Sequence, residues 1–219
     1  MRNLPVRALG IVLGAALLCL GAVFRELPML VLLIKPIPAL VLAATIAIRA
    51  TGRLRGIGTA ALLCCALGDL ILEGRYLAPD LGIPWFALGL SAFLIAHVLF
   101  ILAFLTPPNH TRWWPAIAVG VYAALFLWVL WPKLGALTVP VLVYIAVISL
   151  MIWRALCVQG SMTRQVAIAG GALLFACSDS LIAVDRFLMP FDAARYVILT
   201  TYWLALVSLT IGLLDDASA

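Results

Sequence analysis

Apolar runs of about twenty residues recur along the whole chain and constrain its fold more than any other feature. Of the 219 residues, 66% are hydrophobic and 11% are charged, whereas a soluble domain carries about 25% charged residues. A membrane-spanning helix needs ~20 consecutive, mainly apolar residues. The sequence therefore predicts an all-α, polytopic membrane protein, and we expect residues 1–219 to form a single integral membrane domain.

Turn and interface residues divide the chain into eight expected transmembrane helices. Examples of the separating stretches are Pro79-Asp80, Pro107-Pro108-Asn109 and Gln159-Gly160. The expected spans cover residues 7–24, 28–48, 57–75, 83–105, 113–131, 135–157, 165–187 and 193–214.

Basic residues are unevenly divided between the two sets of loops. The N-terminal side carries Arg2, Arg7, Arg49, Arg53, Arg55, Arg112, Arg154 and Arg164, and the opposite side carries Arg25, Arg75, Lys133, Arg186 and Arg195. Because cytoplasmic loops are enriched in Lys and Arg, we expect both termini in the cytoplasm and the chain in the bacterial inner membrane. The net charge of +5 fits contacts with anionic membrane lipid. No basic cluster with interleaved aromatic residues suggests nucleic acid.

Two segments half a chain apart resemble each other. "ALLCCALGDLILEGRYL" (61–77) and "GALLFACSDSLIAVDRF" (171–187) align at an offset of 110 residues. A duplication would give two parallel four-helix halves; a chance likeness between two helices rich in Leu and Ala is the alternative. In either case, Asp69 and Asp179 should lie at similar depth in spans that run in the same direction.

Ionisable residues within the spans cost roughly 2.5–3.5 kcal/mol each on insertion scales, so each needs a reason. Asp69 and Glu73 share one helix face, and two carboxylates there need a cation or a bound proton. Glu73 could instead reach the headgroups beside Arg75. Asp179 lies deep in the seventh span. We expect Asp69 and Asp179 to perform general acid–base chemistry.

Further polar residues could complete a cavity around these carboxyl groups. Lys35 precedes Pro36 and Pro38, which interrupt the backbone bonding of the second span; it either faces the cavity, holding an aspartate or a phosphate, or extends to the membrane surface. His97 is a candidate ligand or a hydrogen-bonded packing residue. The candidate hydroxyl donors, which could equally serve in packing, are Tyr122, Tyr144 and Tyr202.

The chain offers little for metal or nucleophilic catalysis. Two histidines are too few for a three-histidine zinc site, and the five cysteines show no metal-binding or disulfide spacing. No GxSxG motif marks a serine hydrolase. We therefore expect no metal and no cofactor, and no feature specifies an oligomeric state.

Four segments together resemble the YhhN family of membrane proteins: Lys35-Pro36, "LGDLIL" (67–72), "FALGLSAFLIAHVLFILAF" (86–104) and "LLFACSDSLIAVDRF" (173–187). The resemblance runs from about Lys35 to Gly212. Animal members of this family are lysoplasmalogenases. The resemblance implies a lysophospholipid substrate whose vinyl ether bond is hydrolysed to a fatty aldehyde and glycerophosphoethanolamine or glycerophosphocholine, at a site built around Asp69 and Asp179.

This chemistry suits two carboxyl groups, because vinyl ether hydrolysis needs a proton donor and a carboxylate that stabilises an oxocarbenium ion and activates water. Glu73, Lys35, His97 and the three tyrosines would then bind the substrate or tune the carboxyls. We expect one shared cavity in the outer half of the bilayer, with the aspartates at most ~10–12 Å apart, since water-mediated pairs need about 6.5–9.5 Å. The alternative is a transporter or binding protein for a small molecule or lipid, built from two four-helix halves.

The first testable prediction is topological. Reporter fusions at Ala219 and in the loop near Lys133 should report the cytoplasm for the first and the opposite side for the second, because the N-terminal side holds more arginine. A non-cytoplasmic reporter at Ala219 would reverse the orientation.

Overall fold

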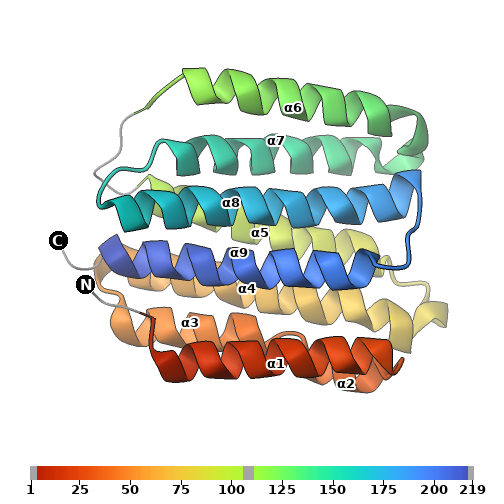
Figure 1. The fold of residues 1–219 in the computed structure, drawn as a ribbon. Helices are drawn as coiled ribbons and strands as arrows, with labels where there is room; N and C mark the ends of the chain where they lie inside the picture. Colours follow the sequence, from red (N-terminus) through yellow and green to blue (C-terminus); the bar gives the residue numbers. More distant parts are fainter. Residues whose placement is uncertain (1–3, 106–110, 217–219) are drawn as a thin grey trace. The chain divides into compact units, whose positions relative to one another are not determined.

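The computed structural model describes residues 4–105 and 111–216, and within these ranges each regular element is a helix (Figure 1). The expected turn at Pro107-Pro108-Asn109, and Arg2 in the charge count, lie outside the described residues. The elements are α1 (Val6–Phe24), α2 (Pro28–Ile34), α3 (Ile37–Arg49), α4 (Gly52–Leu77), η1 (Pro79–Leu81), α5 (Trp85–Phe104), α6 (Trp114–Leu130), η2 (Trp131–Lys133), η3 (Gly135–Leu137), α7 (Thr138–Leu156), α8 (Met162–Ala183), the π-helix η4 (Val184–Leu188) and α9 (Ala194–Asp216).

Eight helical segments of the described chain are long and apolar enough to cross a membrane, which confirms the predicted number of spans. The third begins at Gly52 instead of residue 57, because α4 continues through a polar turn that contains Arg53 and Arg55. The seventh begins at Met162 instead of residue 165, since Ser161 caps α8 by accepting a hydrogen bond from Arg164 N at 3.0 Å. The apolar runs in the sequence predict the part of each helix that lies in the membrane core, and these two helices begin several residues before that part.

Large apolar side chains cover much of the molecular surface. Only 11% of the most apolar 18-residue stretch of the Trp114–Lys133 span is buried within the protein, and Trp128 is 75% exposed. Monomeric soluble proteins rarely expose such continuous apolar surface, but lipid chains solvate it well. The protein is therefore an integral membrane protein.

The chain divides into two compact units, with one boundary at the end of the fourth span and a second within α9. The first unit runs to Ala103 and includes the chain from Leu213 onward; the second comprises Phe104–Gly212. Asp69 and Asp179 each stand 17 residues after the first residue of their helix, Gly52 in α4 and Met162 in α8. The division and this equal register agree with two four-span halves. The prediction of a single membrane domain stays a prediction.

In the first unit, α4 packs against α3 and α2, and α1 packs against α2 and α3 (Figure 1). Glycines bring α4 and α5 close together. A Cβ atom at Gly68 would stand 2.7 Å from the ring of Phe93, and one at Gly89 would stand 2.6 Å from the side chain of Leu72. Small residues at these positions allow a close helix–helix approach, as is common in membrane proteins.

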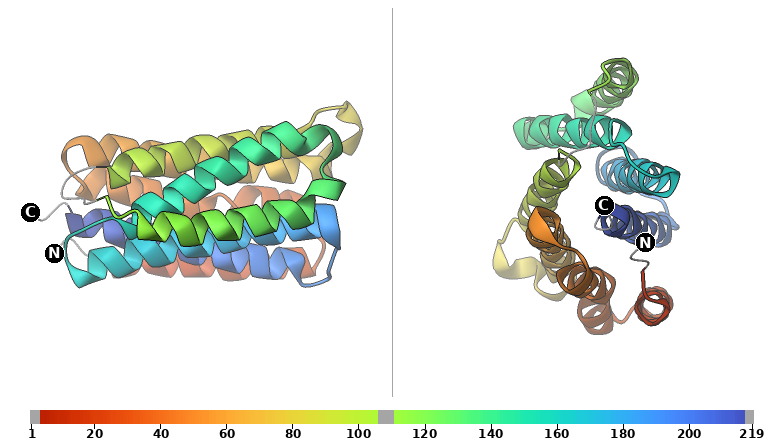
Figure 2. Two further views of the ribbon diagram at one scale, coloured as in Figure 1. Left: turned by 90° about the horizontal axis from the view of Figure 1, so that it is seen from above. Right: turned by 90° about the vertical axis from the view of Figure 1, so that its left-hand side faces the viewer.

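In the second unit, α7 packs against both α6 and α8 (Figure 2). The contact between α8 and α9 also depends on glycine: a Cβ at Gly171 would stand 2.9 Å from the backbone nitrogen of Leu209. Ser208 adds a hydrogen bond across the same pair of helices, donating to Ala167 O at 2.8 Å. The backbones of α8 and α9 therefore approach too closely for a larger residue at Gly171.

Adjacent glycines on α8 provide a test of this packing. Gly171→Ala should lower the thermal unfolding midpoint, because backbone atoms cannot rotate away from the new methyl group, and overpacking costs about 1–3 kcal/mol. Gly170→Ala is the matched control, since its nearest neighbour, Ser208 Oγ, is 4.0 Å away, and alanine favours a helix by roughly 0.5–1 kcal/mol over glycine. Equal midpoints for the two variants in the same detergent would contradict the assigned contact.

Candidate functional site

Lys35 is positioned by the predicted break in the second span. Helix α2 ends at Ile34 and helix α3 begins at Ile37, because Pro36 has no N–H group to continue the helical hydrogen bonds. The backbone is nevertheless well bonded: Lys35 N donates to Val31 O at 2.9 Å, and Leu40 N donates to Pro36 O at 3.0 Å. The break places Lys35 at the C-terminal end of α2, within the second span, where its side chain is buried.

Lys35, Asp69 and Glu73 form a buried cluster, which we call the lysine–carboxyl cluster. Lys35 Nζ donates to Glu73 Oε2 at 3.5 Å and lies 3.9 Å from Asp69 Oδ1. The exposed fractions of Lys35, Asp69 and Glu73 are 8%, 1% and 1%. Lys35 therefore does not extend to the membrane surface, and Glu73 does not reach the headgroups; of the alternatives open from sequence, the structure supports the inward one for both residues.

The cluster combines one basic group with two acidic groups. If all three were ionised, its charge would be −1, and burying uncompensated charge in an apolar environment is very costly. Lys35 provides the cation that the sequence required for this pair. Any remaining charge has to be balanced by a bound proton or by another cation, which suits a site that exchanges protons.

Close packing around Asp69 comes from its neighbour Gly68. The Phe93 ring of α5 lies over Gly68, where a side chain would collide with it. His97 stands one helical turn after Phe93 and is 0% exposed. It therefore lies on the face of α5 that packs against α4.

In the second unit, three consecutive residues of α8 bond to three different helices. Ser178 Oγ donates to Ile198 O on α9 at 3.1 Å. Asp179 Oδ2 accepts from the Tyr144 hydroxyl on α7 at 2.6 Å, and Ser180 Oγ is 2.7 Å from the Tyr122 hydroxyl on α6. Successive helical side chains point about 100° apart, so the sequence Ser-Asp-Ser connects α8 to α9, α7 and α6.

The three candidate tyrosines have different surroundings. Tyr144 is buried and bonds directly to Asp179, whereas Tyr122 is 47% exposed and bonds to Ser180. Tyr202 is buried and packs edge-on against Phe175, with ring centroids 5.5 Å apart. The structure thus places Tyr144 on Asp179, a predicted catalytic residue, and Tyr122 on the adjacent Ser180. It places Tyr202 in the packed interior.

The sequence interpretation missed Ser178 and Ser180. Serine in a membrane helix commonly bonds to its own backbone, and Ser180 does donate to Ala176 O at 2.6 Å. The signal that could have found them is their position on either side of Asp179. Among the described residues, no group of three or more His, Cys, Asp and Glu side chains is arranged to hold a metal ion.

The fold and these polar contacts define a class: an integral membrane protein with eight candidate spans in the described chain, a buried aspartate in the third span and a partly buried aspartate in the seventh. The chain belongs to the YhhN family, which it matches over residues 30–213. This confirms the resemblance inferred from the motifs.

Curated relatives carry the name lysoplasmalogenase. The Mycobacterium bovis protein of that name is 36% identical over 185 residues, covering 80% of this chain and 66% of the relative. Human lysoplasmalogenase TMEM86B is 34% identical over 200 residues, covering 90% of this chain and 80% of the relative. The pig TMEM86B protein is 37% identical over 190 residues, with 82% and 74% covered. The chain thus spans just under two thirds of the mycobacterial relative. No solved structure matches significantly.

The lysine–carboxyl cluster leads to a stability prediction. Lys35→Met should strongly destabilise the protein, since removing one member of a buried ion pair typically costs about 3–5 kcal/mol. The double variant Lys35→Met/Glu73→Gln should recover part of that loss, because it removes one of the stranded carboxyl groups. The measurements are the yield of monodisperse protein in detergent and its thermal unfolding midpoint.

The matched control is Lys133→Met, which removes an exposed lysine from η2. If Lys35→Met were as stable as this control, Lys35 would not neutralise the cluster.

Proposed function

We propose that this protein is a lysoplasmalogenase that hydrolyses the vinyl ether bond of lysoplasmalogens, releasing a fatty aldehyde and glycerophosphoethanolamine or glycerophosphocholine. Three features support this proposal. Relatives with this name match most of the chain, the family match covers both aspartates, and both aspartates lie within candidate membrane spans, as a site for a membrane lipid requires.

The observation that carries the proposal is the pairing of each aspartate with a different kind of partner. Asp69 lies beside the Lys35 ammonium group, and Asp179 accepts a hydrogen bond from the Tyr144 phenol. Acid–base catalysis by two carboxyl groups requires different environments, so that one is protonated while the other is ionised. Asp69 and Asp179 are accordingly the proposed acid and base, in either order.

The reaction balances with these groups and one water molecule. A carboxylic acid transfers its proton to the β-carbon of the vinyl ether, and an oxocarbenium ion forms at the α-carbon. The second carboxylate stabilises this cation and takes a proton from water as the water oxygen bonds to the α-carbon. The second carboxyl group, now protonated, gives its proton to the departing glycerol oxygen, which leaves as an alcohol. The first carboxylate takes the proton of the hemiacetal hydroxyl as the aldehyde forms, so both carboxyl groups return to their starting states. Neither a metal nor a cofactor takes part in this scheme.

The remaining candidates are proposed to position the substrate and the carboxyl groups. Lys35 is proposed chiefly to neutralise Asp69 and Glu73 instead of binding a phosphate, because its ammonium nitrogen is within 3.9 Å of both. Glu73 and Tyr144 then hold the neighbouring acid–base groups. Tyr122, which is 47% exposed, is proposed to contact the lipid. His97 and Tyr202 are buried, so they are proposed to position the helices around the site.

The finer localisation is also a proposal. Both termini are placed in the cytoplasm on the basis of the arginine distribution of the loops, and the membrane is proposed to be a bacterial inner membrane. The partners are then the lysophospholipid substrate and surrounding membrane lipid, without nucleic acid.

Replacing the aspartates separates chemistry from folding. Asp69→Asn and Asp179→Asn should each reduce the turnover of a lysoplasmalogen by a factor on the order of 10²–10⁴, because an amide cannot transfer the proton. Aldehyde release from purified protein in detergent is the measurement. Asp80→Asn, in the exposed turn η1, is the control and should retain activity.

The same measurement distinguishes hydrolysis from transport. Detergent sustains no ion gradient, so aldehyde release there would come from hydrolysis and not from coupled transport. Near-normal aldehyde release from folded Asp69→Asn and Asp179→Asn proteins would refute the catalytic pair. The absence of aldehyde from the wild-type protein would refute the proposed activity.

A further inference from the structure

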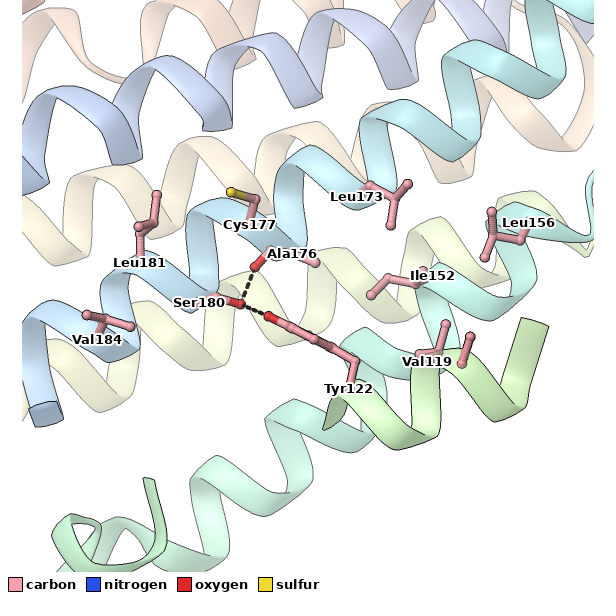
Figure 3. A pocket seen from close by; sticks show the side chains of 11 residues that line it. Val119, Tyr122, Ile152, Leu156, Leu173, Ala176, Cys177, Ser180, Leu181 and Val184 are labelled. Carbon is pink, nitrogen blue, oxygen red and sulfur yellow. Dashed lines mark hydrogen bonds between the residues drawn. The ribbon is translucent and has the colours of Figure 1, made fainter. Parts of the chain in front are cut away.

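A groove runs between α6, α7 and α8 in the second unit, with a cavity volume of about 530 Å³. Figure 3 shows its walls: Tyr122 from α6, Ile152 and Leu156 from α7, Leu173 and Ser180 from α8, and Val184 from η4. The volume lies within the ~300–1,000 Å³ typical of small-molecule sites. The walls are almost wholly apolar, apart from one pair of hydroxyl groups and the Cys177 thiol.

The length and depth of the groove match one leaflet of a bilayer. Its lining extends from Val184, the first residue of η4, back along α8 to Leu173, a rise of ~16 Å at ~1.5 Å per residue. The hydrocarbon core of a bilayer is about 30 Å thick, so the groove covers about half of it. Because the span runs from Met162 to Leu188, the groove reaches from the end near Leu188 to the middle of the span.

The hydroxyl groups of Tyr122 and Ser180 form the polar part of the groove, toward the Leu188 end of the span. Ser180 donates its proton to Ala176 O at 2.6 Å, so the Tyr122 hydroxyl must be the donor in the 2.7 Å bond between Tyr122 and Ser180. The Tyr122 oxygen therefore keeps lone pairs that can accept a hydrogen bond. Phe126 stacks on the Tyr122 ring, with centroids 5.9 Å apart.

We propose that this groove holds the hydrocarbon chain of a single-chain phospholipid, with Tyr122 accepting a hydrogen bond from the free glycerol hydroxyl. A lipid with two chains lacks that hydroxyl and cannot supply the donor. The groove passes Ser180, the residue next to Asp179, so a chain lying in it starts beside a proposed catalytic group. This assignment rests on the proposed function, and it names the substrate subsite for the chain.

Photolabelling tests occupancy without relying on activity. The probe is lysophosphatidylcholine with a diazirine near the end of its chain, presented to the wild-type protein in lipid nanodiscs and mapped by mass spectrometry. The label should concentrate on groove residues near Leu173 and Leu156, and an excess of unlabelled lysophosphatidylcholine should reduce it more than diacylphosphatidylcholine does. Uniform labelling of all lipid-facing helices, or equal competition by both lipids, would overturn the proposal.

Substituting a groove residue tests the chain length that the site accepts. Leu173→Trp should shorten the groove and lower, at least several-fold, the ratio of kcat/KM for an 18-carbon chain to that for a 10-carbon chain. Val166→Trp is the matched control, since it is also on α8 and exposed (62% against 50% for Leu173) but does not line the groove. An unchanged ratio in folded Leu173→Trp protein would contradict the assignment.

Tyr122→Phe tests the polar end. Ser180 keeps its bond to Ala176 in this variant, so the local fold should persist, while the preference of binding for lysophosphatidylcholine over diacylphosphatidylcholine should fall several-fold. An unchanged preference would remove Tyr122 from the site. Failure of the proposed activity is recognised separately: aldehyde would be absent while the probe still labelled the groove. Aldehyde release with labelling elsewhere would overturn the groove alone.

Discussion

The need to neutralise charge within an apolar environment governs the architecture of this protein. A carboxylate or an ammonium group cannot be left alone in the bilayer core, and partners must come from neighbouring helices. In the first unit, a helix broken at Pro36 presents Lys35 to Asp69 and Glu73 on α4. In the second unit, α7 presents Tyr144 to Asp179. Positions that are costly for a membrane helix thus become defined polar sites.

Small residues make this neutralisation compatible with tight packing. Gly68 admits the Phe93 ring directly beside Asp69, and Gly171 allows α9 to approach α8. Ser178 and Ser180 then connect the helix that carries Asp179 to α9 and α6. Helix association in lipid depends on such close contacts and hydrogen bonds, because the hydrophobic effect does not drive helices together within the bilayer. The residues around each aspartate therefore hold the unit together and position its carboxyl group.

The proposed chemistry uses what this packing leaves available. A vinyl ether is hydrolysed through a cationic intermediate, which buried carboxyl groups can stabilise without competition from bulk water. The groove beside Ser180 opens along half the membrane span, so a lipid chain can lie next to Asp179 without leaving the bilayer. The exposed groove would bind the lipid chain, while the buried Asp69 and the partly buried Asp179 would transfer protons.

The sequence alone determined the eight helices, the break at Pro36 and the residues that need partners, because span length and the cost of intramembrane charge are local properties. It also placed Asp69 and Glu73 on one face, since they stand four residues apart. Only the tertiary structure decided that Lys35 neutralises both, that Tyr144 bonds to Asp179, and that Tyr122 and Ser180 form a pair. Those contacts join residues 34 to 58 positions apart, and which faces of two helices meet depends on packing across the unit, which hydropathy does not encode.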